Sequence, residues 1–441
     1  MLSKQTKQTY SLMIKSNRHK VPFLFNLNKV ALLLAVAILL FGSFYKPVRS
    51  ISGFEFIKNY NYYALILLYP LAYLLVLKNK LLTLDFLMMA YFFTTLTNYM
   101  IAKVVFGFVD SGNHLALHIF PISIYFAFRF ISINECFFLK ILCLFTIVSS
   151  LLTYIEFYDI NYIGGNYFDS QGYWEGTFGY QIQMDSRQYP ILGKCSKPWG
   201  MSGRSQASAA LFAGLFIYFF IQNRYLKQYS KFNILIMFLL FLSCFLCGSW
   251  TSVAVVVTML IVSYIGLNVI SISLSLVVMI FMTAALATYF GGGPNTAIYV
   301  AIHSLLLAGI GSINVIMEPV FEFTHNSLMI ILSGQLIGPV RENTQVSLIN
   351  IFLDVGLFST IILFLILFYY IKYVNKLKGT PNWHMHISGM YLIFVLILSS
   401  FHYSSLFSYP ANVIALSIMG IAARDMSQKI KEKMFPLSPD S

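Results

Sequence analysis

The sequence predicts an all-α polytopic membrane protein with about twelve transmembrane helices and two long external loops that contain short interfacial helices. Of its 441 residues 58% are hydrophobic and only 10% are charged, and the mean hydropathy is +0.74. A soluble domain carries about 25% charged residues. Apolar runs follow one another along the chain and give way to long polar sequence only at about 157–205 and 290–345.

The N-terminal third is predicted to be a basic tail followed by a bundle of about five spans. The tail, residues 1–28, is polar, and no small-residue cleavage site follows it, so we expect it to stay in the cytoplasm. The bundle occupies 29–156 because apolar runs of about 20 residues, the length that crosses a bilayer, lie near 29–45, 61–78, 81–101, 115–134 and 136–156.

The middle of the chain is predicted to consist of the first long loop and a second group of spans. The loop, 157–205, mixes charged residues with tyrosines and glycines. The central apolar segment, 206–289, is interrupted by short polar turns, which divide it into spans near 206–223, 232–248, 251–267 and 269–289.

The second long loop, 290–345, opens with the helix terminator Gly291-Gly292-Gly293-Pro294. Its moderately apolar stretches at 297–310 and 326–333 are too short to span and suit interfacial or re-entrant helices. The C-terminal spans, 346–423, are expected near 346–371, 386–407 and 410–423, before a cytoplasmic tail at 424–441.

The positive-inside rule orients this chain. An even number of spans puts both ends on one side, and most basic residues then fall in the cytoplasmic tails and short cytoplasmic turns, although Lys46, Arg49 and Lys58 lie on the other side. The formal charge of +13 therefore orients helices, and we expect no nucleic-acid partner. Both long loops are predicted to lie outside.

Arginines in the long loops are the first candidate binding residues. Arg187, Arg204 and Arg341 all lie in the two polar breaks, and a guanidinium matches phosphate geometry. In a membrane protein the anion is expected to be a lipid head group or a lipid-linked pyrophosphate. The alternative is a solvated surface ion pair, such as Arg187 with Asp185.

Candidate proton-transfer groups lie in the second loop. His325 can accept a proton near neutral pH, and Glu322 and Glu342 are alternative bases. A structural, hydrogen-bonded histidine is the other interpretation. No HExxH, GxSxG or P-loop pattern is present, and the sequence predicts no metal and no cofactor.

A few ionisable residues lie within or beside the predicted spans, and these would also suit a proton-relay transporter. Since most are near helix ends, we expect them to reach the interface with their polar groups. They are Asp85, Lys103, Arg129, Lys140, Asp354 and His402.

Three short motifs of the chain carry a family resemblance: KPWGMSGRSQA from Lys197 to Ala207, His325-Asn326-Ser327, and LDVGL from Leu353 to Leu357. They resemble motifs of bacterial O-antigen ligases and Wzy-type O-antigen polymerases. The stretch from Lys197 to Ala207, KPWGMSGRSQA, resembles the basic-Pro-aromatic-Gly loop that leads into a span in that family. His325-Asn326-Ser327 resembles its His-Asn element, and Leu353-Asp354-Val355-Gly356-Leu357 its acidic-x-Gly-Leu helix. Lys197 stands where the family usually has arginine.

The resemblance implies a metal-independent glycosyltransferase in the bacterial inner membrane, acting on its outer face. Donor and acceptor would be undecaprenyl-pyrophosphate-linked glycans, with the lipid bilayer and a chain-length regulator as further partners. Arg204, Arg341, Lys197 and Arg187 would bind pyrophosphate, and His325, Glu322 or Glu342 would take the acceptor proton. The flat side chains that sugar rings could stack on are Trp174, Trp199 and Tyr180.

Polymerase is preferred to ligase, because the chain lacks several arginines expected of a ligase. Two other classes stay open on the sequence. A transporter or flippase for lipid-linked sugars would line a continuous cavity with cationic residues, and an assembly protein would carry no chemistry.

Overall fold

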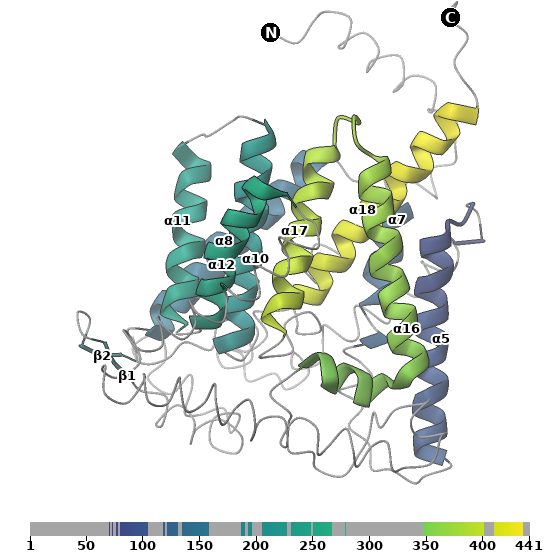
Figure 1. Ribbon diagram of the computed structural model, residues 1–441, viewed down its shortest axis with the longest axis horizontal. Coiled ribbons are helices and arrows are strands. Elements are labelled where there is room, and N and C mark those ends of the chain that lie inside the picture. The colour runs from purple at the N-terminus through teal and green to yellow at the C-terminus, as the bar shows by residue number, and fades with distance from the viewer. Residues whose placement is uncertain are drawn as a thin grey trace, which may run out of the picture.

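The computed structural model describes residues 80–104, 121–130, 135–157, 187–189, 193–195, 205–226, 231–247, 250–266, 347–400 and 410–434, with isolated positions at 70, 73, 76–77, 118–119 and 278. This part of the chain is almost entirely helical (Figure 1). Its elements are α5 (Thr83–Val104), α7 (Ile122–Phe130), α8 (Glu135–Phe157), β1 (Arg187–Tyr189), β2 (Gly193–Cys195), α10 (Ser205–Leu226), α11 (Lys231–Leu246), α12 (Trp250–Ile265), α16 (Ser347–Lys376), α17 (Trp383–Ser399) and α18 (Ala411–Met434).

Three of the described helices are long and apolar enough to cross a membrane, which indicates a membrane protein. The apolar segments are Phe137–Tyr154 in α8, Gln206–Leu226 in α10 and Val355–Lys376 in α16. Shorter apolar helices lie at Lys231–Leu246, Thr251–Ile265 and Trp383–Ser399. Outward-facing apolar side chains on α16, including Phe358, Phe364 and Phe368, suit contact with lipid.

Most of the described helices coincide with predicted spans, with some differences at their ends. In the predicted span 115–134, the described residues include the short helix α7, which is preceded by a turn at Pro121 and by helical positions at 118–119. The span expected at 386–407 is α17, which begins earlier and ends at Ser399. The span expected at 410–423 is α18, which continues to Met434 and so includes part of the predicted tail.

The helix α10 forms the centre of one group of helices, because small residues let its neighbours approach closely. Its first half carries alanines, serines and Gly214, and most of its length is buried. It packs chiefly against α17 and also against α11 and α12, while α8 packs on α11. Cys244 and Cys247 are fully buried here and contribute to this packing.

A second group comprises α5, α7, α16 and α18. The helix α16 packs on α5, and α18 crosses α7 at Gly420. A Cβ atom at Gly420 would lie 2.5 Å from the carbonyl oxygen of Tyr125 and 3.1 Å from the backbone nitrogen of Arg129, so only glycine allows this close crossing. The helix α17 contacts both groups and joins them.

The helix α16 is bent at Gly356, where the backbone is not helical (φ 74, ψ 175). The prediction of one span over 346–371 is therefore incomplete. The apolar segment able to cross a membrane begins at Val355, next to the bend, and the residues before it run in a different direction along the edge of the helices (Figure 1).

The two strands form a short antiparallel hairpin in the first predicted loop. Arg187 pairs with Cys195 and Gln188 with Lys194. Hydropathy did not predict this element, because three-residue strands leave too short a pattern to detect.

Candidate functional site

Arg187 is the one predicted site residue that the described part of the chain includes, as the first residue of β1. Its strand register brings its backbone next to that of Cys195. The other predicted site residues lie outside the described residues: His325, Glu322, Glu342, Arg204, Arg341, Lys197, Trp174, Trp199 and Tyr180. The same is true of Asp185, the alternative partner of Arg187, and of His402.

Two predicted anion-binding residues nevertheless border described helices. Arg204 precedes Ser205, the first residue of α10, by one peptide bond. Arg341 and Glu342 come a few residues before Ser347, where α16 begins. A chain extends at most about 3.6 Å per residue. The positions of Ser205 and Ser347 therefore limit how far away Arg204, Arg341 and Glu342 can lie.

The opposite ends of these helices gather on a face that we call the basic face. Contacts between helix ends define it: Arg224 of α10 hydrogen-bonds Ser263 of α12, and Asn233 of α11 hydrogen-bonds Asn223 of α10. The Nζ of Lys429 on α18 donates to the carbonyl of Lys376 on α16 at 2.5 Å. Described basic residues at this face are Lys80, Arg129, Arg224, Lys231, Lys372, Lys376, Lys378, Arg424, Lys429 and Lys431.

Both Ser205 and Ser347 are at the other ends of their helices, away from the basic face. The helices α10 and α16 run from these residues toward Arg224 and Lys376, and in Figure 1 both helices begin at their lower ends, on the same side as β1 and β2. Each long polar segment thus joins a helix on the side opposite the basic face.

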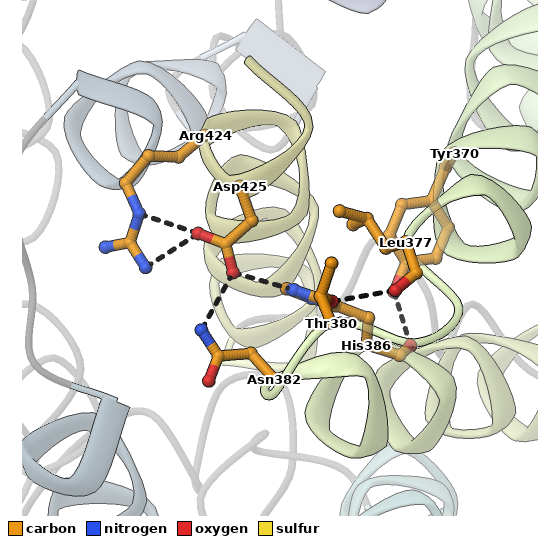
Figure 2. Close-up of polar contacts among 7 residues, drawn as sticks. All are labelled: Tyr370, Leu377, Thr380, Asn382, His386, Arg424 and Asp425. Atoms are coloured by element: carbon orange, nitrogen blue, oxygen red, sulfur yellow. Dashed lines mark hydrogen bonds and ion pairs between the residues drawn. The ribbon is translucent and has the colours of Figure 1, made fainter. Parts of the chain in front are cut away.

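A buried polar cluster around Asp425 links α17 to α18 at the basic face (Figure 2). One carboxylate oxygen, Oδ2, accepts hydrogen bonds from His386 Nε2 at 2.9 Å and Asn382 Nδ2 at 3.4 Å. The other, Oδ1, accepts from Arg424 Nε and Nη2, both at 3.0 Å. The side chains of His386 and Asp425 are only 0% and 9% exposed.

The electrostatics of this cluster stabilise the ionised form of Asp425. Burial alone would raise the pKa of its carboxyl group, but the hydrogen bond from His386 and the positive charge of Arg424 outweigh burial and hold the pKa below its ordinary value. A carboxylate accepts hydrogen bonds only, so the contact fixes a proton on Nε2 of His386.

The position of His386 favours a structural role for the Asp425 cluster. Its Nδ1 is buried and has no hydrogen-bond partner among the described residues. Tyr370 of α16 donates to the carbonyl oxygen of His386 at 3.3 Å, which adds α16 to the same network. The cluster therefore ties α16, α17 and α18 together at one end. Sequence analysis missed it, because its partners are far apart in the chain.

A second buried cluster joins α5 to α7. The carboxylate of Asp85 accepts hydrogen bonds from Arg129 Nε at 3.1 Å, Tyr125 Oη at 2.6 Å and the backbone nitrogen of Leu82 at 2.7 Å. The side chains of Asp85 and Arg129 are 0% and 4% exposed. The prediction that these two residues extend to the interface was wrong: each neutralises the other inside the protein.

The other predicted intramembrane charges behave differently. Lys103 and Lys140 have exposed side chains, and Lys103 lies 5.7 Å from the ring centroid of Tyr99. Asp354 lies in the part of α16 that precedes the bend at Gly356.

A small, largely apolar cavity of about 50 Å³ lies between α5, α7, α16 and α18. Tyr91 Oη and His118 Nδ1, 3.0 Å apart, form a polar contact at its wall, and Asn412 also lines it. Its size suits at most a water molecule or part of a lipid chain. It does not suit a sugar.

No group of three or more histidine, cysteine, aspartate or glutamate residues in the described segments could hold a metal ion. Comparison of the chain with protein-family models, curated proteins and solved structures finds no match.

Proposed function

We propose that the protein is a membrane glycosyltransferase of the O-antigen polymerase and ligase type, and that it polymerises oligosaccharide repeat units carried on undecaprenyl pyrophosphate. The reaction takes place on the outer face of the bacterial inner membrane. The chain crosses that membrane about twelve times, and both termini are cytoplasmic. A chain-length regulator is a further partner.

The observation that carries this proposal is the separation of the two faces. Basic residues gather at one set of helix ends, and the positive-inside rule assigns that face to the cytoplasm. Each long polar segment leads into a helix at the opposite set of ends, at Ser205 and Ser347. Arg204 and Arg341 are close in sequence to these residues, so the proposal assigns both arginines to the outer side.

The proposed reaction uses charge and proton transfer alone. A hydroxyl oxygen of the acceptor sugar attacks the anomeric carbon of the donor, and the bond from that carbon to the pyrophosphate oxygen breaks with its electron pair. His325, Glu322 or Glu342 takes the hydroxyl proton. Arg204, Arg341, Lys197 and Arg187 stabilise the negative charge of the leaving pyrophosphate.

Aromatic residues of the first loop would orient the sugars. Trp174, Trp199 and Tyr180 offer flat faces on which sugar rings stack. Their place in the same polar segment as Arg187 and Lys197 supports a shared role in holding one glycan.

A transporter or flippase for lipid-linked sugars is the alternative function. It requires cationic side chains along a path through the membrane. Within the described helices, the buried cation Arg129 is neutralised by Asp85, and Arg224 lies at a helix end bound to Ser263. These contacts favour the glycosyltransferase.

The test is the polysaccharide ladder of a host strain that lacks the gene and carries the wild-type chain or a variant. Arg204→Ala and Arg341→Ala are expected to abolish long chains and leave a single repeat unit on the lipid A core, at equal amounts of membrane protein. The matched control, Lys372→Ala, removes an exposed charge from the basic face and should leave the ladder intact.

Other outcomes of this experiment separate the alternatives. Complete loss of attached glycan with accumulation of lipid-linked polymer indicates a ligase. An unchanged ladder in both arginine variants and in the strain without any copy contradicts the glycosyltransferase and leaves the transporter or an assembly protein.

A further inference from the structure

Buried polar side chains occur along most of the length of α5. Asp85, Thr95 and Asn98 are 0%, 0% and 6% exposed. At 3.6 residues per turn, Tyr91, Thr95 and Asn98 share one face of the helix, whereas Asp85 lies on a different side. Asp85 contacts α7 at the basic face, whereas Thr95 and Asn98 contact α16 near the opposite face.

Asn98 contacts α16 at its bend. Its side-chain nitrogen Nδ2 donates to the carbonyl oxygen of Val355 at 2.9 Å and to Ser359 Oγ at 3.2 Å. Thr95 Oγ1 is 3.4 Å from the same serine oxygen. Val355, Ser359 and Thr95 are fully buried, so these groups have little access to water.

The hydrogen bond from Asn98 has a specific reason to exist. In a continuous helix, the Val355 carbonyl would accept from the backbone nitrogen four residues later. The non-helical backbone at Gly356, with φ 74, interrupts that regular pattern, and a carbonyl inside a membrane protein must find another donor. The Asn98 amide supplies one.

The bend decides the direction of the chain between the membrane and the second polar segment. Residues after Gly356 form the apolar span, whereas the part of α16 from Ser347 to Val355 runs aside from it (Figure 1). This part connects directly to the segment that contains Arg341 and Glu342. If α16 were straight, the residues from Ser347 to Val355 would continue along the axis of the apolar span.

We propose that Asn98 is a positioning residue for the reaction. By holding the bend at Gly356, it directs the first part of α16 so that Arg341 and Glu342 are presented to the lipid-linked substrate. This role rests on the proposed function. Asn98 itself touches neither donor nor acceptor.

The first arm of the test measures the bend directly. Spin labels are attached to cysteines introduced at Ser347 and Phe368, in a chain whose native cysteines are replaced. A straight helix would separate these positions by about 32 Å, from a rise of about 1.5 Å per residue, and a bend brings them closer. Asn98→Leu, which keeps the branched shape of the side chain but removes the donor, should lengthen the measured distance toward the straight value.

The second arm measures the polysaccharide ladder with the same variants. Asn98→Leu should reduce long chains to the single repeat unit at equal amounts of membrane protein. Asn98→Gln keeps the amide donor and should restore both the short distance and the ladder. The matched control is Thr95→Val, which removes only the weaker contact to Ser359 and should change neither readout.

Gly356→Ala provides an independent variant, because an alanine at φ 74 is strained and favours the straight helix. If Asn98→Leu does not accumulate in the membrane, the label distance and the ladder are measured with Gly356→Ala instead. An unchanged label distance in these variants overturns the role of Asn98 in the bend. A lengthened distance with a full ladder overturns its positioning role.

The two proposals fail in distinguishable ways. If Arg204→Ala and Arg341→Ala also leave the ladder intact, the glycosyltransferase function fails and the positioning role fails with it. If the arginine variants lose the ladder while the straightened Asn98 variant keeps it, the positioning role alone fails.

Discussion

Removing one partner of the buried ion pair between Asp85 and Arg129 should destabilise the protein strongly, because the other charge is then left buried without a counter-ion. Removal of Asp85 in Asp85→Leu leaves a guanidinium that is 4% exposed without its counter-ion. Breaking a buried pair in this way costs about 3–5 kcal/mol. That is a large share of the net stability of a typical protein, about 5–15 kcal/mol.

The hydrogen bonds of Asp85 indicate that the loss of stability in Asp85→Leu lies in the upper part of this range. The same carboxylate accepts the Tyr125 hydroxyl at 2.6 Å and the Leu82 backbone nitrogen at 2.7 Å, and both donors lose their partner in Asp85→Leu. The pair also lies favourably for both helix dipoles, since Asp85 is in the first turn of α5 and Arg129 in the last turn of α7. Tyr125→Phe removes one hydrogen bond to a charged acceptor and should cost about 1.5–3 kcal/mol.

A double-mutant cycle isolates the interaction. Arg129→Met alone leaves the Asp85 carboxylate buried and should also cost about 3–5 kcal/mol. The double variant replaces both charges by apolar groups and should be much more stable than the two single losses together imply, with a coupling of about 3 kcal/mol.

The assay is denaturant unfolding of the purified protein in detergent micelles. Lys103→Met in α5 removes an exposed charge and should stay within about 0.5 kcal/mol of wild type. Single variants that lose less than about 1 kcal/mol, or a coupling below about 0.5 kcal/mol, would refute the reasoning.

Two further predictions concern α18. Gly420→Ala should lower the unfolding free energy by about 1–3 kcal/mol, because its Cβ would lie 2.5 Å from the Tyr125 carbonyl oxygen. The control is Gly214→Ala, whose Cβ would lie in ordinary contact, 3.4 Å from Leu392 Cγ. Equal losses of unfolding free energy in these two variants would contradict the close crossing of α18 and α7. The lowered pKa of Asp425 means that the unfolded chain binds the proton more readily, so this residue contributes stability above about pH 4 that is lost as the pH falls through the lowered pKa. Asp425→Asn should be less stable than wild type at neutral pH and should lose less stability as the pH falls below about 4, and an acid transition identical to wild type would contradict this.

Long apolar runs made several helices predictable from sequence. The helices α5, α8, α10, α11 and α12 agree with predicted spans to within a few residues, because polar turns separate runs of nearly the right length for a bilayer. Hydropathy reports this contrast well. It does not report where a helix bends or how far a polar helix continues beyond the membrane.

The differences in α16 and α18 have this origin. Apart from Asp354, Gly356 lies within an apolar run, and hydropathy carries no information on its backbone conformation. The last third of α18 is rich in charged and amide side chains and reads as a tail, although lysine, glutamate and glutamine are good helix formers. Weighing helix propensity beside hydropathy would have extended this helix.

Buried polar pairs were harder to predict, because their partners come from distant parts of the chain. Asp85 and Arg129 were identified as unusual charges, yet each was assigned to the interface separately. His386 and Asp425 fell at the edges of predicted spans and gave no signal. Sequence spacing within one helix identifies a shared face, but pairing between helices requires their packing.

The helix α5 contacts α7 near one of its ends and α16 near the other, so the predictions for Asp85 and for Asn98 can be tested separately. Its Asp85 contacts α7 at the basic face, and its Asn98, about 20 Å farther along the helix, contacts the bend of α16. The first contact neutralises a buried charge, whereas the second replaces a backbone hydrogen bond at one defined bend. Asp85→Leu should therefore lower stability and leave the label distance in the folded protein unchanged, whereas Asn98→Leu should change that distance. If both variants moved the distance equally, α5 would act as a single rigid support, and Asn98 would have no positioning role of its own.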